Sequence, residues 1–389
     1  MIILKENKDC CGCNACVQRC PKNCITMQED NEGFLYPVID VAFCVDCGLC
    51  ESVCPVINQS SPRKPRVTYA AKNRDKAIRG QSSSGGVFTA LAKQVIYDNG
   101  VVFGAKFNAK REVVHAYTET VEGLADFRGS KYVQSIVGHT YKEAERFLKK
   151  GRRVLFSGTP CQISGLNLFL RKKYNNLLTV DFVCHGVPSP TVWQRYLEEV
   201  IPVEKQSSIT EISFRDKING WKSYNFIIKE KDEIILREKF HDNLFMKGFL
   251  ADLYLRPSCY ACPVKSLKSN SDITLGDYWG IQNILPTFDD DYGVSLVFLH
   301  DDTWIDCFTK MNLDLSETSF EDAIKYNPAV VKSVNLPDKR KDFWDKYKYS
   351  HEGLGLIIKK NTRLSLKQKI KRNLYPYYKK IMEKKWQRK

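Results

Sequence analysis

Eight cysteines near the start of the chain stand in two copies of one spaced pattern, which limits what residues 1–60 can fold around. In each copy, gaps of two, two and three residues separate four cysteines, and a proline follows the last one. The first copy holds Cys10, Cys13, Cys16 and Cys20, and the second holds Cys44, Cys47, Cys50 and Cys54. Runs with this spacing bind 4Fe-4S clusters, and the fourth cysteine ligates the cluster of the other run. The spacing therefore assigns Cys10, Cys13, Cys16 and Cys54 to one cluster, and Cys44, Cys47, Cys50 and Cys20 to the other.

Zinc binding and disulfide bonding are the alternatives for these thiols. Zinc sites usually show two pairs of ligands with a longer spacer between them. The N-terminus lacks the features of a signal peptide, and no run approaches 18 apolar residues, so we expect a cytoplasmic protein in which disulfides rarely persist. We therefore predict a bacterial ferredoxin-like module over residues 1–60. Cys11 and Cys24 fall outside the pattern and are not expected to be ligands.

A second, larger domain is expected over residues 66–345, after a linker rich in proline and small polar residues at 57–66. The hydrophobic content of 43% is ample for its core. Apolar residues at helical spacing predict a helix from about Gly86 to Asp98, between strands at 67–73 and 101–107. Strand, helix and strand at 153–157, about 162–173 and 177–184 predict a parallel βαβ unit. The fold class is thus mixed α/β.

Four further cysteines suggest a third metal site in this domain. Cys161 and Cys184 each follow a strand of the βαβ unit, and parallel strands place their carboxyl ends at the same sheet edge. Cys259 and Cys262 add a two-residue spacing followed by a proline. Together they predict another 4Fe-4S cluster, with ordinary buried cysteines as the alternative. Cys307 is expected to be a packing residue.

Two short stretches rich in glycine and serine are candidates for binding a phosphate or an aromatic ring. Ser83, Ser84, Gly85 and Gly86 precede the predicted helix, where free N–H groups favour a phosphate. A plain capped helix explains this stretch about as well. Ser130, Lys131 and Tyr132 form the second stretch, for which a solvated loop before a strand is the alternative. Asp277, after a predicted strand, is better explained as a turn-capping residue than as a proton carrier. No catalytic residue is assigned.

Several motifs in order resemble the coenzyme F420 hydrogenase/dehydrogenase beta-subunit family, here preceded by the two-cluster module. They are "SSSGGVFTAL", "GSKYVQS", "LFSGTPCQISGL", "DFVCHGVPSP", "ISFRDK" followed by "GW", and "SDITLGDYWGI", within residues 66–285. The resemblance implies an FAD-binding domain with Ser83, Ser84, Gly85 and Gly86 at the flavin and Ser130, Lys131 and Tyr132 nearby. It also implies that Cys161, Cys184, Cys259 and Cys262 ligate a cluster.

The expected function is that of an iron–sulfur flavoprotein oxidoreductase. A flavin can take a hydride and release single electrons, so it joins two-electron reactants to 4Fe-4S clusters. The partners would be a redox protein or small electron carrier and a small-molecule substrate. Two rival interpretations remain: an electron-relay subunit without its own substrate, and a scaffold protein whose flavin pocket is inert.

The C-terminal residues 359–389 carry twelve of the fifteen net positive charges of the chain. Apolar residues in this tail recur at helical spacing, which predicts a basic amphipathic helix. Such a helix binds an anionic membrane surface, here the inner face, or an acidic partner; covering the body of the protein is the alternative. Nucleic acid is not expected to be a partner, because the positive charge is confined to the tail.

Overall fold

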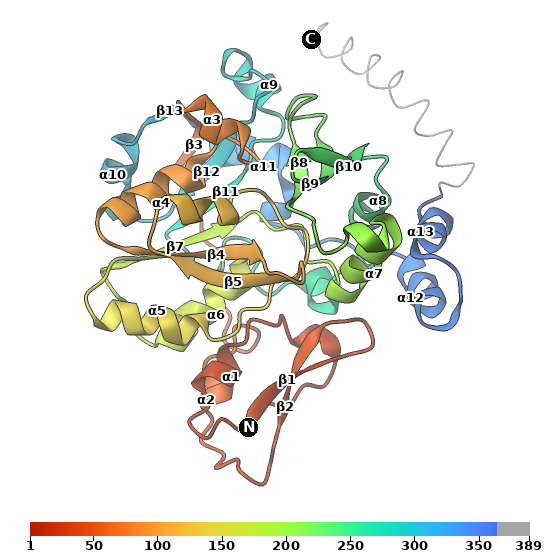
Figure 1. The fold of residues 1–389 in the computed structure, drawn as a ribbon. Coiled ribbons are helices and arrows are strands. Elements are labelled where there is room, and N and C mark those ends of the chain that lie inside the picture. The colour runs from red at the N-terminus through yellow and green to blue at the C-terminus, as the bar shows by residue number, and fades with distance from the viewer. Residues whose placement is uncertain (364–389) are drawn as a thin grey trace, which may run out of the picture.

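A computed structural model of the chain describes residues 1–363 (Figure 1). Residues 364–389, which make up most of the predicted basic tail, lie outside the described residues. A small N-terminal module with two short strands and two short helices lies at one end of a much larger mixed α/β body.

The N-terminal module is built around an antiparallel hairpin of β1 (Ile25–Glu29) and β2 (Leu35–Ile39). Each cysteine run leads into a short helix, α1 (Ala15–Arg19) or α2 (Leu49–Ser52). The residue before each helix has a left-handed backbone, with φ of 63° at Asn14 and 71° at Gly48. Both residues lie in the second gap of a cysteine run, so the chain turns sharply between successive thiols.

The body contains an eight-stranded mixed sheet. In sheet order its strands are β13 (Leu313–Thr318), β3 (Val67–Asn73), β12 (Ser295–Leu299), β11 (Ile273–Asp277), β7 (Leu177–Phe182), β6 (Val154–Gly158), β4 (Val101–Phe107) and β5 (Val113–Thr118). The four central strands β11, β7, β6 and β4 are parallel, and the outer strands pair antiparallel. The predicted parallel βαβ unit is therefore present, formed by β6, α6 (Pro160–Leu170) and β7.

Helices cover both faces of this sheet because successive residues of its strands point to opposite sides. In β4, Val101 and Phe103 pack with α5 (Thr140–Lys149) and α6, whereas Val102 packs with α4 (Val87–Tyr97). Figure 1 shows α4 on one side of the strands and α5 and α6 on the other. Short α3 (Lys76–Gly80), α10 (Ile305–Thr309) and α11 (Phe320–Tyr326) pack around the antiparallel edge.

A second, three-stranded antiparallel sheet lies beside the large one, in the order β10 (Glu233–Lys239), β9 (Asn225–Glu230) and β8 (Glu211–Asp216). Its hairpin turns at Lys231, which has a φ of 52°. Four helices share a core with this sheet: α7 (Pro190–Val200), α8 (Leu244–Leu250), α12 (Lys339–Tyr349) and α13 (Leu354–Thr362). In the described residues no helix is both long and apolar enough to cross a membrane.

The helices and strands predicted from the sequence are present in the structure, with small shifts at their ends. The helix expected from about 162 begins at Pro160, because the side chains of Thr159 and Gln162 cap its first turn reciprocally. It ends at Leu170, since Arg171 has a left-handed backbone with φ of 58°. The helix predicted from Gly86 to Asp98 is α4.

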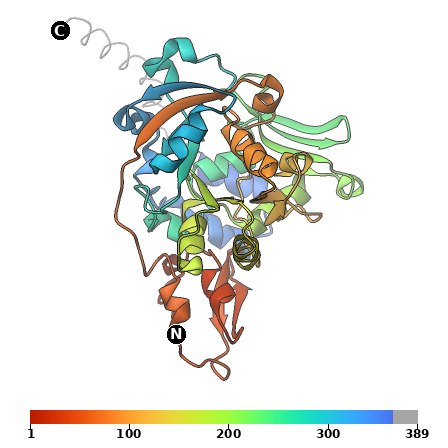
Figure 2. The same cartoon turned by 90° about the vertical axis from the view of Figure 1, so that its left-hand side faces the viewer.

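The module packs into the body through a shared hydrophobic core. Cys11, Cys13, Ala15 and Val53 from the module are buried together with residues of β4, β6, α5 and α6. Gln18 on α1 is 2% exposed, and its side-chain carbonyl oxygen accepts hydrogen bonds from the N–H groups of Tyr141 (3.0 Å) and Lys142 (3.2 Å). The chain then leaves the module and runs along one side of the body to β3 (Figure 2). Burial and hydrogen bonds thus fix where the module meets the sheet.

Candidate functional site

The first group of predicted ligands, here the inner group, comprises Cys10, Cys13, Cys16 and Cys54. Burial raises the pKa of Cys16 to about 12, and the neighbouring thiols of Cys10 and Cys54 act in the same direction. Cys13 is also a neighbour of Cys16 and Cys54, and all but Cys10 are less than a tenth exposed. The structure therefore places these four thiols near one another, and Cys50 of the second run is also a neighbour of Cys16 and Cys54.

The second group, here the outer group, comprises Cys20, Cys44, Cys47 and Cys50. All four line one cavity, together with Cys24, Met1 and Lys22. The backbone N–H of Ile2 donates to the Cys50 sulfur at 3.3 Å. Burial raises the pKa of Cys20, but hydrogen bonds from Cys24 and from nearby backbone N–H groups outweigh it, so the pKa is lowered overall. Cys47 is exposed, so this group reaches the protein surface.

Cys161, Cys184, Cys259 and Cys262, here the third group, line a larger cavity in the body with about 660 Å³ of empty space. Cys161 lies in the first turn of α6, directly after β6, and Cys184 follows β7. Because β6 and β7 are parallel neighbours, both residues reach the same edge of the sheet. Cys259 and Cys262 approach this edge from a 3-10 helix at Pro257–Ala261. The third group thus lies together at one edge of the sheet.

Backbone N–H groups lie near three sulfurs of the third group. The N–H of Val187 donates to Cys259 at 3.5 Å. The N–H of Gly186 lowers the pKa of Cys184, and those of Val264 and Lys265 lower the pKa of Cys262. Burial raises the pKa of Cys184 to about 12, although the nearby Lys265 ammonium lowers it.

The cysteines surround cavities instead of converging on one point. In residues 1–363, no three His, Cys, Asp or Glu side chains are grouped closely enough to hold a single metal ion.

Cys11, which is not expected to be a ligand, lines the larger cavity beside the third group. Its thiol is a close neighbour of Cys161 of the third group and of Cys13 of the inner group. A single cysteine outside a spaced run gives no sequence signal for such a position. Its side chain lies where the module meets the body, between two groups of predicted ligands.

Two hydrogen bonds join the two stretches that are predicted to bind flavin. Ser83 Oγ accepts hydrogen bonds from the Ser130 N–H at 2.6 Å and from the Ser130 hydroxyl at 2.8 Å, so the two glycine and serine stretches meet. Gly86 has φ of 81° and immediately precedes α4, as predicted. Burial lowers the pKa of Lys131 to about 8, and its ammonium donates to the Arg128 carbonyl at 3.0 Å. Neither of the two cavities is lined by these residues.

Tyr132 belongs to a buried polar and aromatic cluster that the sequence did not reveal. Its hydroxyl accepts from Arg215 Nη1 at 3.3 Å, and the same nitrogen donates to Asp277 at 2.6 Å. The guanidinium is stacked on Tyr224 and Trp279, at 4.3 Å and 5.2 Å from the ring centroids. Arg215 is 5% exposed, and within the described chain its Nε and Nη2 atoms have no hydrogen-bond partner.

An aromatic contact links this cluster to the larger cavity. The ring of Tyr132 stacks on Phe249 with 5.0 Å between centroids, and Phe249 meets the His185 ring edge-on at 5.2 Å. His185 follows Cys184 and lines the larger cavity, and its Nε2 lies 2.6 Å from an Asp252 carboxylate oxygen. The predicted flavin residues and the third group are therefore close neighbours in the fold.

Comparison with known proteins identifies both parts of the chain. Residues 151–323 match the C terminus of the family "Coenzyme F420 hydrogenase/dehydrogenase, beta subunit", and residues 9–58 match a 4Fe-4S dicluster domain. The chain joins these two domains. It is 27% identical over 191 residues to the F component of the F(420)H(2) dehydrogenase of Methanosarcina mazei, an alignment covering 45% of this chain and 53% of that protein.

Two further relatives match different parts of the chain. The module is 39% identical over 64 residues to a 7Fe ferredoxin of Hydrogenibacillus schlegelii, covering 16% of this chain and 76% of that protein. A chain of the F420-reducing [NiFe] hydrogenase complex from Methanosarcina barkeri aligns with a TM-score of 0.47 at 18% identity, covering 75% of this chain and 96% of that one. The chain spans little more than half the length of the longer curated relatives it matches.

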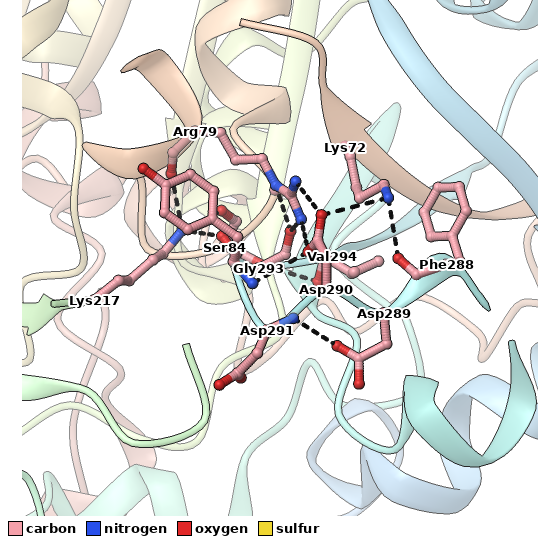
Figure 3. Close-up of polar contacts among 12 residues, drawn as sticks. Lys72, Arg79, Ser84, Lys217, Phe288, Asp289, Asp290, Asp291, Gly293 and Val294 are labelled. Carbon is pink, nitrogen blue, oxygen red and sulfur yellow. Dashed lines mark hydrogen bonds and ion pairs between the residues drawn. The ribbon is translucent and has the colours of Figure 1, made fainter. Parts of the chain in front are cut away.

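A buried lysine ties the predicted flavin loop to a segment distant in the sequence (Figure 3). Lys217 is 7% exposed, and its ammonium donates to the carbonyls of Arg79 (2.8 Å), Ser84 (2.6 Å) and Tyr292 (3.0 Å). Arg79 forms a bidentate ion pair with Asp290 and also donates to the Gly293 carbonyl. Lys217 and Arg79 thus hold residues 79–86 against residues 290–293.

We expect Lys217→Met to loosen this loop, because it leaves three buried carbonyls without their donor. Amide hydrogen exchange in residues 82–86 and 290–294 should report a fall of about 2 kcal/mol in the free energy of local opening. The control is Lys222→Met, since Lys222 is about a third exposed and pairs with Asp289 at the same segment. The control should cost less than about 1 kcal/mol. Equal exchange in both variants would contradict the account.

Proposed function

We propose that the chain is an iron–sulfur flavoprotein oxidoreductase that passes electrons between 4Fe-4S clusters and FAD, and on to a two-electron substrate or cofactor. The observation that carries the proposal is the position of the third group. Its cavity lies where the module, through Cys11, meets the body, and His185 and Phe249 connect it to the Tyr132 cluster.

The match to a 4Fe-4S dicluster domain implies two clusters in the module. We infer that the inner group holds one and the outer group the other. The exposed Cys47 makes the outer group the accessible one for an external redox partner, such as a redox protein or small electron carrier. The inner group is buried against the body, on the side of Cys11 and the larger cavity. The order of the groups suits exchange between the surface and the interior.

The chemistry of the third group is suited to binding a further 4Fe-4S cluster. It offers four thiols around one cavity, backbone N–H groups directed at the sulfurs, and the Lys265 ammonium beside them. Hydrogen bonds of this kind stabilise thiolates bound to iron and help to set the reduction potential. We therefore propose Cys161, Cys184, Cys259 and Cys262 as its ligands.

The residues around Tyr132 fit an FAD that would supply the missing hydrogen-bond acceptors. Buried donors without partners are rare in native proteins, and Arg215 carries two. A guanidinium binds the charged oxygens of phosphates and carboxylates best, and it also donates to neutral carbonyl oxygens. The loop formed by Ser83, Gly86 and Ser130 lies at the N-terminus of α4, where phosphates bind well. We propose that these residues hold the flavin, with Arg215 and Tyr132 at its polar edge.

Bound flavin would exchange a hydride with a two-electron reactant and single electrons with the clusters. Lys217 and Arg79 would keep the flavin loop in place, and Trp221 and Arg215 would hold Asp277 through both of its carboxylate oxygens. The name of the relative from Methanosarcina mazei makes a reduced deazaflavin one candidate for the hydride donor.

A relay subunit without its own substrate is the second candidate function. It is favoured by one observation: the relative from Methanosarcina mazei is named as a subunit of a dehydrogenase, so it works as one part of an assembly. Retention of FAD during purification separates the two functions, because a relay built only from clusters would carry none.

Iron content tests the third group. Protein purified without oxygen should contain about twelve irons per chain, and the Cys259→Ser/Cys262→Ser double variant about eight, because each cubane holds four. Cys307→Ser is the matched control, since this partly buried cysteine lies outside both cavities, and it should keep all the iron. If the wild-type protein contains only about eight irons and the double variant does not lose any, the third cluster does not exist.

Flavin content tests the second cofactor. We expect about one FAD per wild-type chain, and at least a tenfold weaker affinity in Arg215→Leu, since a charge-assisted hydrogen bond contributes about 1.5–3 kcal/mol. Absorbance and fluorescence of released flavin give the content. Arg237→Leu, on the partly exposed β10, is the control and should bind FAD normally. A wild-type protein that neither retains nor takes up FAD would support the relay.

A further inference from the structure

Arg256 is fully buried at the junction between the module and the body. Its backbone is fixed within the third group: the N–H donates to the Val187 carbonyl at 3.0 Å, and its carbonyl accepts from the Cys259 N–H at 2.9 Å. Val187 follows Cys184 by three residues, and Cys259 follows Arg256 by three. The arginine is therefore anchored to the two chain segments that carry three of the four cysteines of the third group.

The side chain of Arg256 crosses into the module and contacts it with two of its nitrogens. Nε donates to the Cys10 carbonyl at 2.7 Å, and Nη2 donates to the Leu35 carbonyl at 2.9 Å. Nη1 donates to Gln134 Oε1 at 2.9 Å, and the amide of Gln134 in turn donates to the Cys11 carbonyl at 3.2 Å. One guanidinium thus holds the start of the first cysteine run against the body.

The module and the body approach each other closely at Gly12, a residue of the first cysteine run. Gly12 has φ of 70°, and a Cβ atom there would lie 2.6 Å from the Gln134 amide nitrogen and 2.8 Å from Arg256 Nη1. The left-handed backbone favours glycine, and a Cβ atom would push the ends of the Gln134 and Arg256 side chains out of their present positions. The first cysteine run is therefore shaped to receive Arg256 and Gln134.

The charge of Arg256 has no ordinary counter-ion. Tyr36 and Phe34 lie 4.3 Å and 5.5 Å from the guanidinium, and no Asp or Glu of the described residues forms an ion pair with it. A buried cation is costly unless negative charge lies nearby. The thiols of Cys10 and Cys259, which are predicted ligands from the two sides of the junction, are the groups that can supply it when they bind iron as thiolates.

We propose that Arg256 is a positioning residue that locks the module onto the body and raises the reduction potential of the cluster held by the inner group. This inference rests on the proposed function, because it takes the thiolates of bound clusters as the missing negative charge. Reduction adds one electron, and hence one negative charge, to a cluster. A fixed positive charge nearby stabilises the reduced form, and Arg256 keeps its own protons throughout.

Arg340 provides a matched control, because it also joins the module to the same segment of the body. It forms a bidentate ion pair with Glu32 of the module and donates to the Leu255 carbonyl at 3.2 Å. Its charge is already neutralised by Glu32, and it contacts no cysteine of the described chain. A residue that merely holds the module in place should behave like Arg340.

The test is a redox titration of the purified full-length protein, followed by electron paramagnetic resonance. In Arg256→Gln, the potential of one module cluster should fall by at least about 59 mV, which corresponds to a tenfold change for a one-electron couple. Arg256→Lys, which keeps the charge, should shift less than half as far, and Arg340→Gln should leave the potential unchanged. Iron content and proteolysis of the 57–66 linker show whether the module stays folded and docked.

Equal shifts in the Arg256→Gln and Arg340→Gln variants, or no shift in either, would overturn the proposal. If the module no longer docks in Arg256→Gln, the Arg256→Lys variant becomes the test. A docked module whose cluster has a potential near that of the wild type supports the charge effect. A potential shifted as far as in Arg256→Gln contradicts it. A wild-type protein with only about eight irons would refute the third cluster. The potential of the module cluster would still test Arg256, so the two failures can be told apart.

Discussion

The parallel pairing of β6 with β7 is the constraint on which the rest of the site depends. It places Cys161 and Cys184 at one edge of the large sheet, and parallel β11 carries Asp277 to the same edge. The module then packs against α6, the helix that begins at this edge, and brings Cys11 beside Cys161. A different register or direction of these strands would separate the third group from both the module and the Tyr132 cluster.

Much of the fold could be predicted from the sequence because its signals are local. The spacing of the eight module cysteines, the apolar pattern of α4 and the βαβ unit depend on residues close together in the chain. The meeting of Ser83 with Ser130 was expected only from the resemblance. The proximity of two such distant loops can be predicted only when several short motifs are considered together.

The residues that join the parts could not be predicted. Arg256 reaches Cys10 across 246 positions, and Arg215 reaches Tyr132 across 83. A lone arginine has no spacing or periodicity, and its role depends on burial and on partners that only the tertiary structure supplies. The position of Cys11 could not be predicted for the same reason. Cys11 lies at the larger cavity because of the way the module docks on the body, which the spacing of the cysteines does not reveal.

The central claim is that three iron–sulfur clusters lie between the protein surface and the Tyr132 cluster. X-ray diffraction from anaerobically grown crystals, with an anomalous difference map at the iron absorption edge, tests it most directly. The account predicts three strong peaks, one of them in the larger cavity among Cys161, Cys184, Cys259 and Cys262. Two peaks confined to the module, with no iron in that cavity, would contradict it.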